Sequence, residues 1–117
     1  PGQPDDPLGC VLFEQDGRSG VEFPVDGGRI DILAVDRDGK YVAIALKLAQ
    51  GRNRALGQLL YYMGWIDRNL GREPCRGIVI ASEISEELTI AVSRAPGVGL
   101  YRYRMNFSLE RAGAQTV

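Results

Sequence analysis

The most regular pattern in the chain is a pair of alternating segments, 30–35 and 41–47, on either side of the turn sequence Asp-Arg-Asp-Gly-Lys. Gly39 suits the left-handed position of a three-residue hairpin loop, so we predict that Asp36 lies opposite Lys40. This register gives one wholly apolar face, on which the opposed pairs are Ile30 and Leu46, Ile32 and Ile44, and Ala34 and Val42. The other face brings Asp31 opposite Ala45, with Lys47 on the same side of the sheet. Because a shift by one residue would mix the two faces, the pattern favours this register.

Helical periodicity follows the hairpin. Apolar residues at three- and four-residue spacing predict a helix over 53–69 that stops at Gly71, with a core stripe formed by Leu56, Leu59, Leu60, Met63, Ile66 and Leu70. A second stripe on this helix carries Gln58, Tyr62, Trp65 and Asn69. We predict further strands at 10–15, 20–25, 76–82, 98–103 and 105–109, and a helix over 86–94 capped by Ser85. This order predicts an α/β sheet flanked by helices.

Length and composition limit the possible classes of protein. The chain has 117 residues, enough for one domain, which we place at 10–111 between a Pro- and Gly-rich linker at 1–9 and a tail at 112–117. Its net charge of -1 carries no overall basic signature, so any contact with DNA must come from a local patch. The absence of histidine excludes histidine-dependent triads and histidine metal sites. Because the chain begins with Pro1, we expect it to be a fragment of a longer protein.

Cysteine usage and hydropathy indicate a cellular compartment. Cys10 and Cys75 have no metal-binding spacing, and we interpret them as two thiols of a cytoplasmic protein, although the sequence leaves a disulfide open. No apolar run approaches membrane-spanning length, and the start of the chain does not resemble a signal peptide. We therefore expect a cytoplasmic protein without a membrane partner.

Two polar residues, Asp31 and Lys47, interrupt strands that are otherwise apolar. An acid, a second acid across from it and a lysine two residues later form the layout of a PD-(D/E)XK nuclease site. In such a site two carboxylates hold a divalent metal, and the metal and the lysine activate water and stabilise the transition state. Asp31 could instead cap a loop, and Lys47 could protect a sheet edge from aggregation. Their shared alignment with position 45 favours a functional role for both.

Three segments, GRIDILAVDRDG, VAIALK and GQLLYYMGW, resemble the NucS/EndoMS-type, RecB-like nuclease domain of the PD-(D/E)XK superfamily. The strand RGIVIA and the closing segment VSRAPGVGLYRYRMNFSLE match as well, so the resemblance covers about residues 12–111. It implies a restriction-endonuclease-like fold with a mixed central sheet flanked by helices, and a metal-dependent DNA endonuclease that uses Mg²⁺ or Mn²⁺, in DNA repair or defence. It also implies that Asp31 binds the metal, that Lys47 is catalytic, and that Gln58 and Tyr62 form the helical Q-x3-Y motif that orients the site. Gln58 and Tyr62 could alternatively be boundary residues of the helix.

The chain departs from this family at position 45, where Ala45 stands in place of the metal-binding Glu. Two explanations are open. The protein could have lost activity naturally, or the alanine could have been introduced to abolish activity, and the intact nuclease pattern around position 45 favours the second explanation. In either case we expect weak or absent metal binding, and slow or no cleavage. Glu22 is a candidate for an additional metal ligand and could equally be a solvated strand residue, whereas Glu14 is better explained as a solvated strand residue. Leu48 is a milder departure, since a basic residue is common there in the family.

The expected partners follow from the same reasoning. Arg52 and Arg54, together with Lys47, would form a phosphate-facing patch for DNA, although as solvated charges the two arginines need no such role. The resemblance also implies an upstream DNA-binding domain that lies outside this fragment, and a homodimer is possible. An alternative of another class is a non-catalytic module that tethers DNA or a protein on the same fold. A metabolite-binding domain is disfavoured because the chain has no glycine-rich phosphate loop between a strand and a helix.

Overall fold

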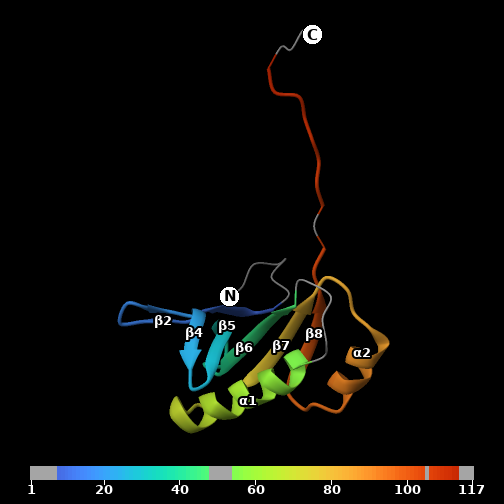
Figure 1. The fold of residues 1–117 in the computed structure, drawn as a ribbon. Coiled ribbons are helices and arrows are strands. Elements are labelled where there is room, and N and C mark those ends of the chain that lie inside the picture. Colours follow the sequence, from blue (N-terminus) through green and yellow to red (C-terminus); the bar gives the residue numbers. More distant parts are fainter. Residues whose placement is uncertain (1–7, 48–53, 105, 114–117) are drawn as a thin grey trace.

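The predicted hairpin lies in the middle of a mixed sheet (Figure 1). The computed structural model describes residues 8–47, 54–104 and 106–113. Within these residues the sheet has six strands in the order β1, β5, β6, β7, β8, with β4 also pairing with β5, and β2 and β3 form a separate small hairpin. Strand β5 is antiparallel to β1, β4 and β6, whereas β6, β7 and β8 run parallel. The elements are β1 Cys10–Leu12, β2 Glu14–Gln15, β3 Arg18–Ser19, β4 Val21–Val25, β5 Gly28–Asp36, β6 Tyr41–Lys47, α1 Arg54–Asn69, β7 Arg76–Ala81, α2 Glu86–Ser93 and β8 Val98–Arg102.

The turn end of the hairpin between β5 and β6 has the predicted register. Val35 pairs with Tyr41, and the Asp36 N–H donates to the Lys40 carbonyl at 2.9 Å. Gly39 has a φ of 80°, as the left-handed loop position requires. The Asp36 carboxylate also accepts the backbone N–H groups of Asp38 and Lys40, each at 2.9 Å. The side chain of Asp36 therefore holds the loop closed in the predicted register.

The opposite end of the hairpin departs from the prediction. The ladder between β5 and β6 ends at Ile32 and Ile44, and the predicted pairing of Ile30 with Leu46 is wrong. Ile30 packs in the core that faces the helices, and Leu46 is 37% exposed. The physical reason is that the Leu46 N–H donates to the Asp31 carboxylate at 2.8 Å, so a side chain takes the place of the next backbone partner.

Both helices cover the same face of the sheet. One core cluster joins Leu59, Met63 and Ile66 of α1 and Leu88 of α2 to sheet residues that include Val79. The opposite face of the sheet carries a second cluster formed by Ala34, Val42, Ile44 and Ile78. Instead of helices on both sides, the described residues therefore form a mixed sheet with its two helices on one side. No helix among them is long and apolar enough to cross a membrane.

Helix boundaries agree with the sequence patterns to within one residue. Helix α1 runs from Arg54 to Asn69, and Gly71 follows it with a φ of 79°. The predicted core stripe of α1 is wrong at one position, because Leu60 is 42% exposed whereas Tyr62 is 7% exposed. Helix α2 ends at Ser93, and the Ser85 hydroxyl accepts the Leu88 N–H at 3.0 Å as its predicted N-cap.

Two predicted strands differ from the structure. The strand at 10–15 is divided into β1 and β2, because Phe13 between them bonds Leu33 and Gly20 through its backbone. The predicted strand at 105–109 is absent from the described residues 106–109, which are irregular and exposed. Beyond β8 the chain runs away from the body of the molecule (Figure 1). Alternating apolar residues there therefore have no neighbouring strand in the part of the chain that the structure describes.

The cysteines are both thiols, as predicted. Cys75 is buried, and its N–H donates to the Asp67 carboxylate at 2.7 Å. Burial raises the pKa of the Cys75 thiol to about 12, and the negative charge of Asp67 acts in the same direction. A hydrogen bond from the Ala43 backbone lowers the pKa but does not outweigh these two causes. This thiol is therefore structural rather than reactive.

Candidate functional site

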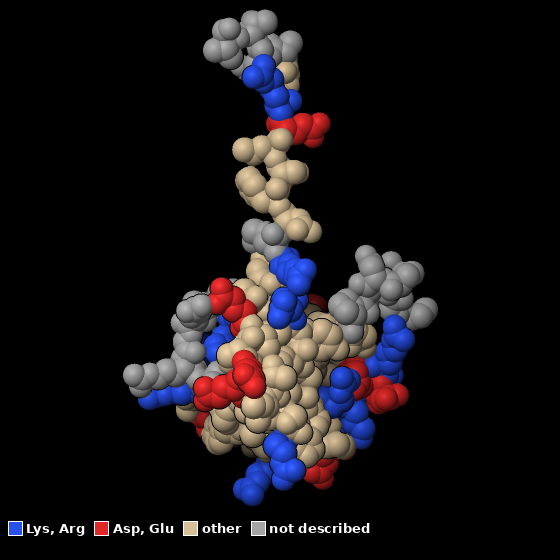
Figure 2. All heavy atoms as spheres, turned by 90° about the vertical axis from the view of Figure 1, so that its right-hand side faces the viewer, with Lys and Arg blue, Asp and Glu red and all other residues tan. Residues whose placement is uncertain are grey.

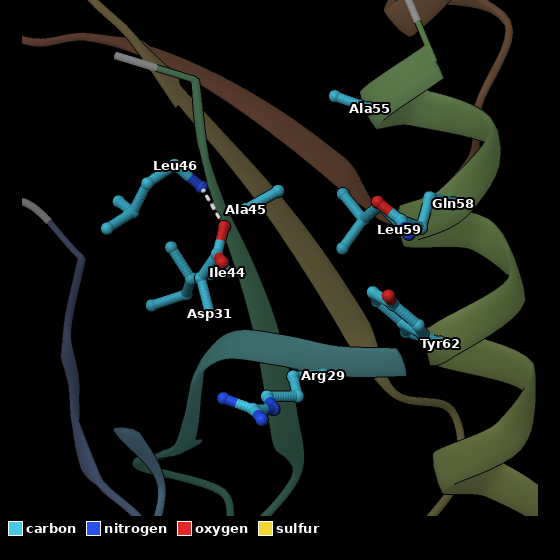
Figure 3. Close-up of a pocket in the computed structure, with 9 residues that line it drawn as sticks. All are labelled: Arg29, Asp31, Ile44, Ala45, Leu46, Ala55, Gln58, Leu59 and Tyr62. Carbon is cyan, nitrogen blue, oxygen red and sulfur yellow. Dashed lines mark hydrogen bonds between the residues drawn. The ribbon is translucent and has the colours of Figure 1, made fainter. Parts of the chain in front are cut away.

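A pocket of about 90 Å³ lies between the open end of the central hairpin and helix α1 (Figure 3). Strands β5 and β6 form one wall and α1 forms the other. The lining residues are Arg29, Asp31, Ile44, Ala45, Leu46, Ala55, Gln58, Leu59 and Tyr62. Four residues that the sequence indicated as site residues, namely Asp31, Ala45, Gln58 and Tyr62, therefore meet in one place.

Asp31 is held at the point where β5 and β6 separate. Its side chain is exposed, and Oδ2 accepts the Leu46 N–H at 2.8 Å (Figure 3). This hydrogen bond restricts the orientation of the carboxylate, because rotation of the side chain would break it. The hydrogen bond thus directs the carboxylate toward β6, on the side of the pocket where Ala45 lies.

Ala45 is partly buried and packs against the core that faces the helices. Its methyl group points toward α1 in Figure 3. Lys47 follows two residues later on β6, so strand alternation places both side chains on the same face. Lys47 is half-buried at the end of β6, where it pairs in register with Ala81, and it does not line the pocket.

Gln58 and Tyr62 come from successive turns of α1. The Gln58 side chain is exposed and points into the pocket, whereas Tyr62 is buried (Figure 3). The Tyr62 hydroxyl lies against the backbone of Gly28, where a Cβ atom would approach it to 2.5 Å. Gly28 is therefore required for the close packing of Tyr62 against the start of β5.

The remaining predicted site residues lie outside the pocket. Glu22 lies on β4 between Val21 and Phe23, which pair with Ile32 and Ile30, and its φ is 49°. Its carboxylate pairs with Arg29 at 3.6 Å. Both side chains of this pair are about two-thirds exposed, so the pair adds little stability. Arg54 is the exposed first residue of α1, and Arg52 lies outside the described residues. In the described part of the chain, no group of three His, Cys, Asp or Glu residues could hold a metal ion.

The sequence patterns did not single out Arg29 and Ala55, although both line the pocket. Signals for them were present, since Arg29 precedes Asp31 by two residues and Ala55 precedes Gln58 by three. Arg29 is the basic residue among the described lining residues, and its guanidinium pairs with Glu22 at 3.6 Å.

Comparisons with known proteins identify the family of the chain. The family model of the endonuclease NucS C-terminal domain matches residues 17–98. Endonuclease NucS of Bifidobacterium animalis subsp. lactis is 33% identical over 93 residues, which are 74% of this chain and 39% of that protein. Endonuclease NucS of Pyrococcus abyssi is 34% identical over 65 residues, which are 56% of this chain and 26% of that protein.

Solved structures share the fold. A repair endonuclease from Pyrococcus abyssi has a TM-score of 0.66 at 24% identity, over 81% of this chain and 38% of that chain. The EndoMS-dsDNA2 complex has a TM-score of 0.68 at 20% identity, over 87% of this chain and 39% of that chain. The chain spans well under half the length of each of these proteins. Because the family model covers most of the chain, the chain belongs to the endonuclease NucS C-terminal domain family.

Proposed function

We propose that this chain is the nuclease domain of a DNA endonuclease with a RecB-like, PD-(D/E)XK site on a restriction-endonuclease-like fold, and that Ala45 impairs its catalysis. The observation that carries the proposal is the pocket in which Asp31, position 45, Gln58 and Tyr62 meet. Membership of the NucS C-terminal domain family supports an endonuclease. The substrate we propose is DNA, because the similar EndoMS structure is a complex with double-stranded DNA. A role in DNA repair or defence and a cytoplasmic location belong to the same proposal.

The residues of this chain fit a divalent metal less well than they fit the other parts of the proposed function. Among the residues that the structure describes, Asp31 is the one carboxylate that lines the pocket, and one of its oxygens already accepts the Leu46 N–H. Ala45 offers no ligand atom, and the Glu22 carboxylate is turned to Arg29. Mg²⁺ and Mn²⁺ require several hard oxygen ligands, so these residues do not fit either ion well. No catalytic step through a metal therefore follows for the chain with Ala45.

In this proposal, residues of the chain bind DNA and hold the parts of the site in position. The exposed amide of Gln58 offers a donor and an acceptor at the mouth of the pocket. Tyr62 fixes α1 against β5 through its contact with Gly28. Lys47 and Arg54, with Arg52 outside the described residues, are proposed to contact DNA phosphates beside the pocket.

Restoring the missing carboxylate tests this proposal. We expect Ala45→Glu to produce Mn²⁺- or Mg²⁺-dependent cleavage of DNA, at least about a thousandfold above the parent chain, since loss of metal assistance costs several kcal/mol at about 1.4 kcal/mol per tenfold in rate. Ala45→Gln is the matched control, because it has nearly the same size without the charge. Ala45→Glu combined with Lys47→Ala should remain inactive. The assay is gel electrophoresis with single-stranded, duplex, branched and mismatched DNA, using the chain alone and joined to a DNA-binding domain.

A non-catalytic binding module is the second candidate, and Ala45 itself favours it. If Ala45→Glu stays inert on every substrate, the nuclease proposal fails. The binding module is then supported if the parent chain binds DNA with the same affinity in the presence of Mg²⁺ and of a chelator, as measured by fluorescence anisotropy. If the parent chain binds none of these DNA substrates, a DNA-tethering role is excluded as well.

A further inference from the structure

Arg29 and Asp31 of β5 line the pocket, and Glu22 of the adjacent strand β4 pairs with Arg29 at 3.6 Å. The face of the molecule that carries β8 and α2 is, in contrast, largely uncharged at its centre (Figure 2). The charged groups beside the pocket are held by two paired strands, so the backbone geometry of β4 and β5 decides where each of them lies. This geometry is irregular at Asp31 and at Glu22.

Strand β5 changes face at Asp31. In a regular strand, residues i and i+2 point to the same face of the sheet. Ile30 packs in the core cluster that faces the helices, whereas Ile32 packs against the cluster on the opposite face. Leu33 lies in the helix-facing cluster again, so the alternation is regular beyond this point. A single irregularity at Asp31 therefore separates two regular parts of β5.

Strand β4 changes face at the matching position. Val21 pairs with Ile32, Phe23 pairs with Ile30, and cross-strand partners share a face. Phe23 lies in the helix-facing cluster, so Val21 is on the other face although only Glu22 separates the two. Glu22 has a φ of 49°, which is a left-handed conformation. The left-handed backbone of Glu22 is therefore the point at which β4 changes face.

Glutamate seldom adopts a left-handed conformation, because its Cβ atom then approaches the following carbonyl oxygen. The side chain of Glu22 gives no reason for it, since both side chains of its ion pair with Arg29 are about two-thirds exposed and the pair adds little stability. Pairing with β5 on both sides of Glu22 holds the conformation instead. Strained backbone of this kind is concentrated at functional sites, where the surrounding structure maintains it.

The change of face in β5 determines the hydrogen bond of Asp31. With unbroken alternation, β5 would continue its ladder with β6 through Ile30 and Leu46. The observed ladder ends at Ile32 and Ile44, and Ile30 is turned to the helix-facing cluster. The Leu46 N–H therefore remains for Asp31, whose Oδ2 accepts it at 2.8 Å beside the pocket (Figure 3).

We propose that Glu22 is a positioning residue of the pocket, and that its left-handed backbone, not its carboxylate, brings Asp31 to the Leu46 N–H. Both strands change face at one matching position, so a change of the backbone at Glu22 is transmitted directly to Asp31. The role of Asp31 in cleavage rests on the proposed function. The placement of its carboxylate does not, because it can be measured on the parent chain without DNA or metal.

A set of substitutions separates the backbone of Glu22 from its carboxylate. Glu22→Gly removes the carboxylate and permits a positive φ without strain, whereas Glu22→Gln removes the charge but keeps the size and the backbone preference. Glu22→Val disfavours the left-handed region most strongly. Glu14→Val is the matched control, because it makes the same change at an exposed strand residue whose φ is not positive.

Hydrogen exchange of the Leu46 amide, relative to the Asp36 amide at the closed end of the same hairpin, measures the placement of Asp31. This ratio should stay within about twofold of the parent in Glu22→Gly, Glu22→Gln and Glu14→Val, and should rise about tenfold or more in Glu22→Val. Glu22→Gly should also melt at or above the temperature of the parent, because it relieves strain. Glu22→Ala, a milder change in the same direction, replaces valine if that variant does not fold. An unchanged ratio in the folded valine or alanine variant overturns the proposal, as does a rise of similar size in Glu22→Gly and Glu22→Gln.

Cleavage in the Ala45→Glu background tests the catalytic meaning of this position. Glu22→Val should lower kcat about tenfold or more with little change in KM, since misplacement of a reacting group affects the chemical step more than binding. Glu22→Gly should cleave about tenfold or more faster than Glu22→Val. If Ala45→Glu is inert while the exchange ratios follow the expected order, the nuclease proposal fails and the positioning of Asp31 by Glu22 is supported. If Ala45→Glu cleaves DNA but the exchange ratio does not respond to Glu22→Val, this inference fails alone.

Discussion

The hydrogen bond from Leu46 to Asp31 predicts that two substitutions of this aspartate will have different effects on stability. Asp31→Ala removes the acceptor and leaves the Leu46 N–H at the open end of the hairpin without its partner. Hydrogen bonds to charged groups contribute about 1.5–3 kcal/mol, and solvent exposure of Asp31 reduces the expected loss to about 1 kcal/mol. For a domain of this size, 1 kcal/mol lowers the melting temperature by roughly 4 °C. Asp31→Asn keeps an acceptor oxygen, so its melting temperature should stay within about 2 °C of the parent chain.

The assay combines thermal unfolding with hydrogen exchange of the Leu46 amide. Asp31→Ala should accelerate this exchange, whereas Asp31→Asn should change it little. Asp38→Ala is the control, because it removes a carboxylate from the closed end of the same hairpin. In an Ala45→Glu background, both substitutions of Asp31 should abolish cleavage, so Asp31→Asn would separate catalysis from stability. Equal melting temperatures for Asp31→Ala and Asp31→Asn, with unchanged exchange at Leu46, would refute the structural role assigned to this carboxylate.

Two further predictions concern titratable groups outside the pocket. Desolvation raises the pKa of Asp36, but hydrogen bonds from Lys40, Arg76 and Asp38 outweigh it and lower the pKa below 3.8. The resulting stability is therefore fully present above the unfolded pKa of 3.8 and is lost as the pH falls through the lower folded-state pKa. In urea titrations, the advantage of the parent over Asp36→Asn should stay constant from about pH 7 to about pH 5 and shrink as the pH falls further, and an advantage that stays constant below pH 3.8 would contradict this. The Cys75 thiol, with a pKa raised to about 12, should resist iodoacetamide at about pH 8 until denaturant is added, as mass spectrometry of modified peptides would show. Modification of native Cys75 at the rate of a model thiol would contradict its burial.

The sequence predicted the closed end of the hairpin better than its open end. At the closed end, Gly39 and the two alternating faces all specify one register. At the open end, the alternation of Ile30 and Leu46 specified a further pair, but the Asp31 side chain bonds the Leu46 N–H instead. Periodicity measures which side chains are apolar, and it does not detect a polar side chain that competes for a backbone group.

Distant parts of the chain decide which side chains of α1 are buried and whether the segment after β8 forms a strand. Leu60 and Tyr62 are both compatible with an amphipathic helix, and the contact between Tyr62 and Gly28 buries the tyrosine. The local pattern of α1 contains no information about Gly28, which lies on β5. Likewise, alternation at 105–109 indicates a segment able to form a strand, but a strand also needs an edge within reach. Local propensity therefore predicted the existence of elements more reliably than their partners.

If position 45 is a catalytic position, as we propose, the same hairpin explains how alanine there leaves the fold intact. The register is held at one end by Asp36 and its loop, and at the other end by Asp31 and Leu46. Neither set of contacts involves the side chain at position 45, whose methyl group packs against the core that faces the helices. A glutamate at this position would add a second negative charge near Asp31, which is unfavourable unless a cation or Lys47 compensates it. Alanine avoids that repulsion, so under the proposed function Ala45 would meet the structural requirements of this site without the catalytic ones.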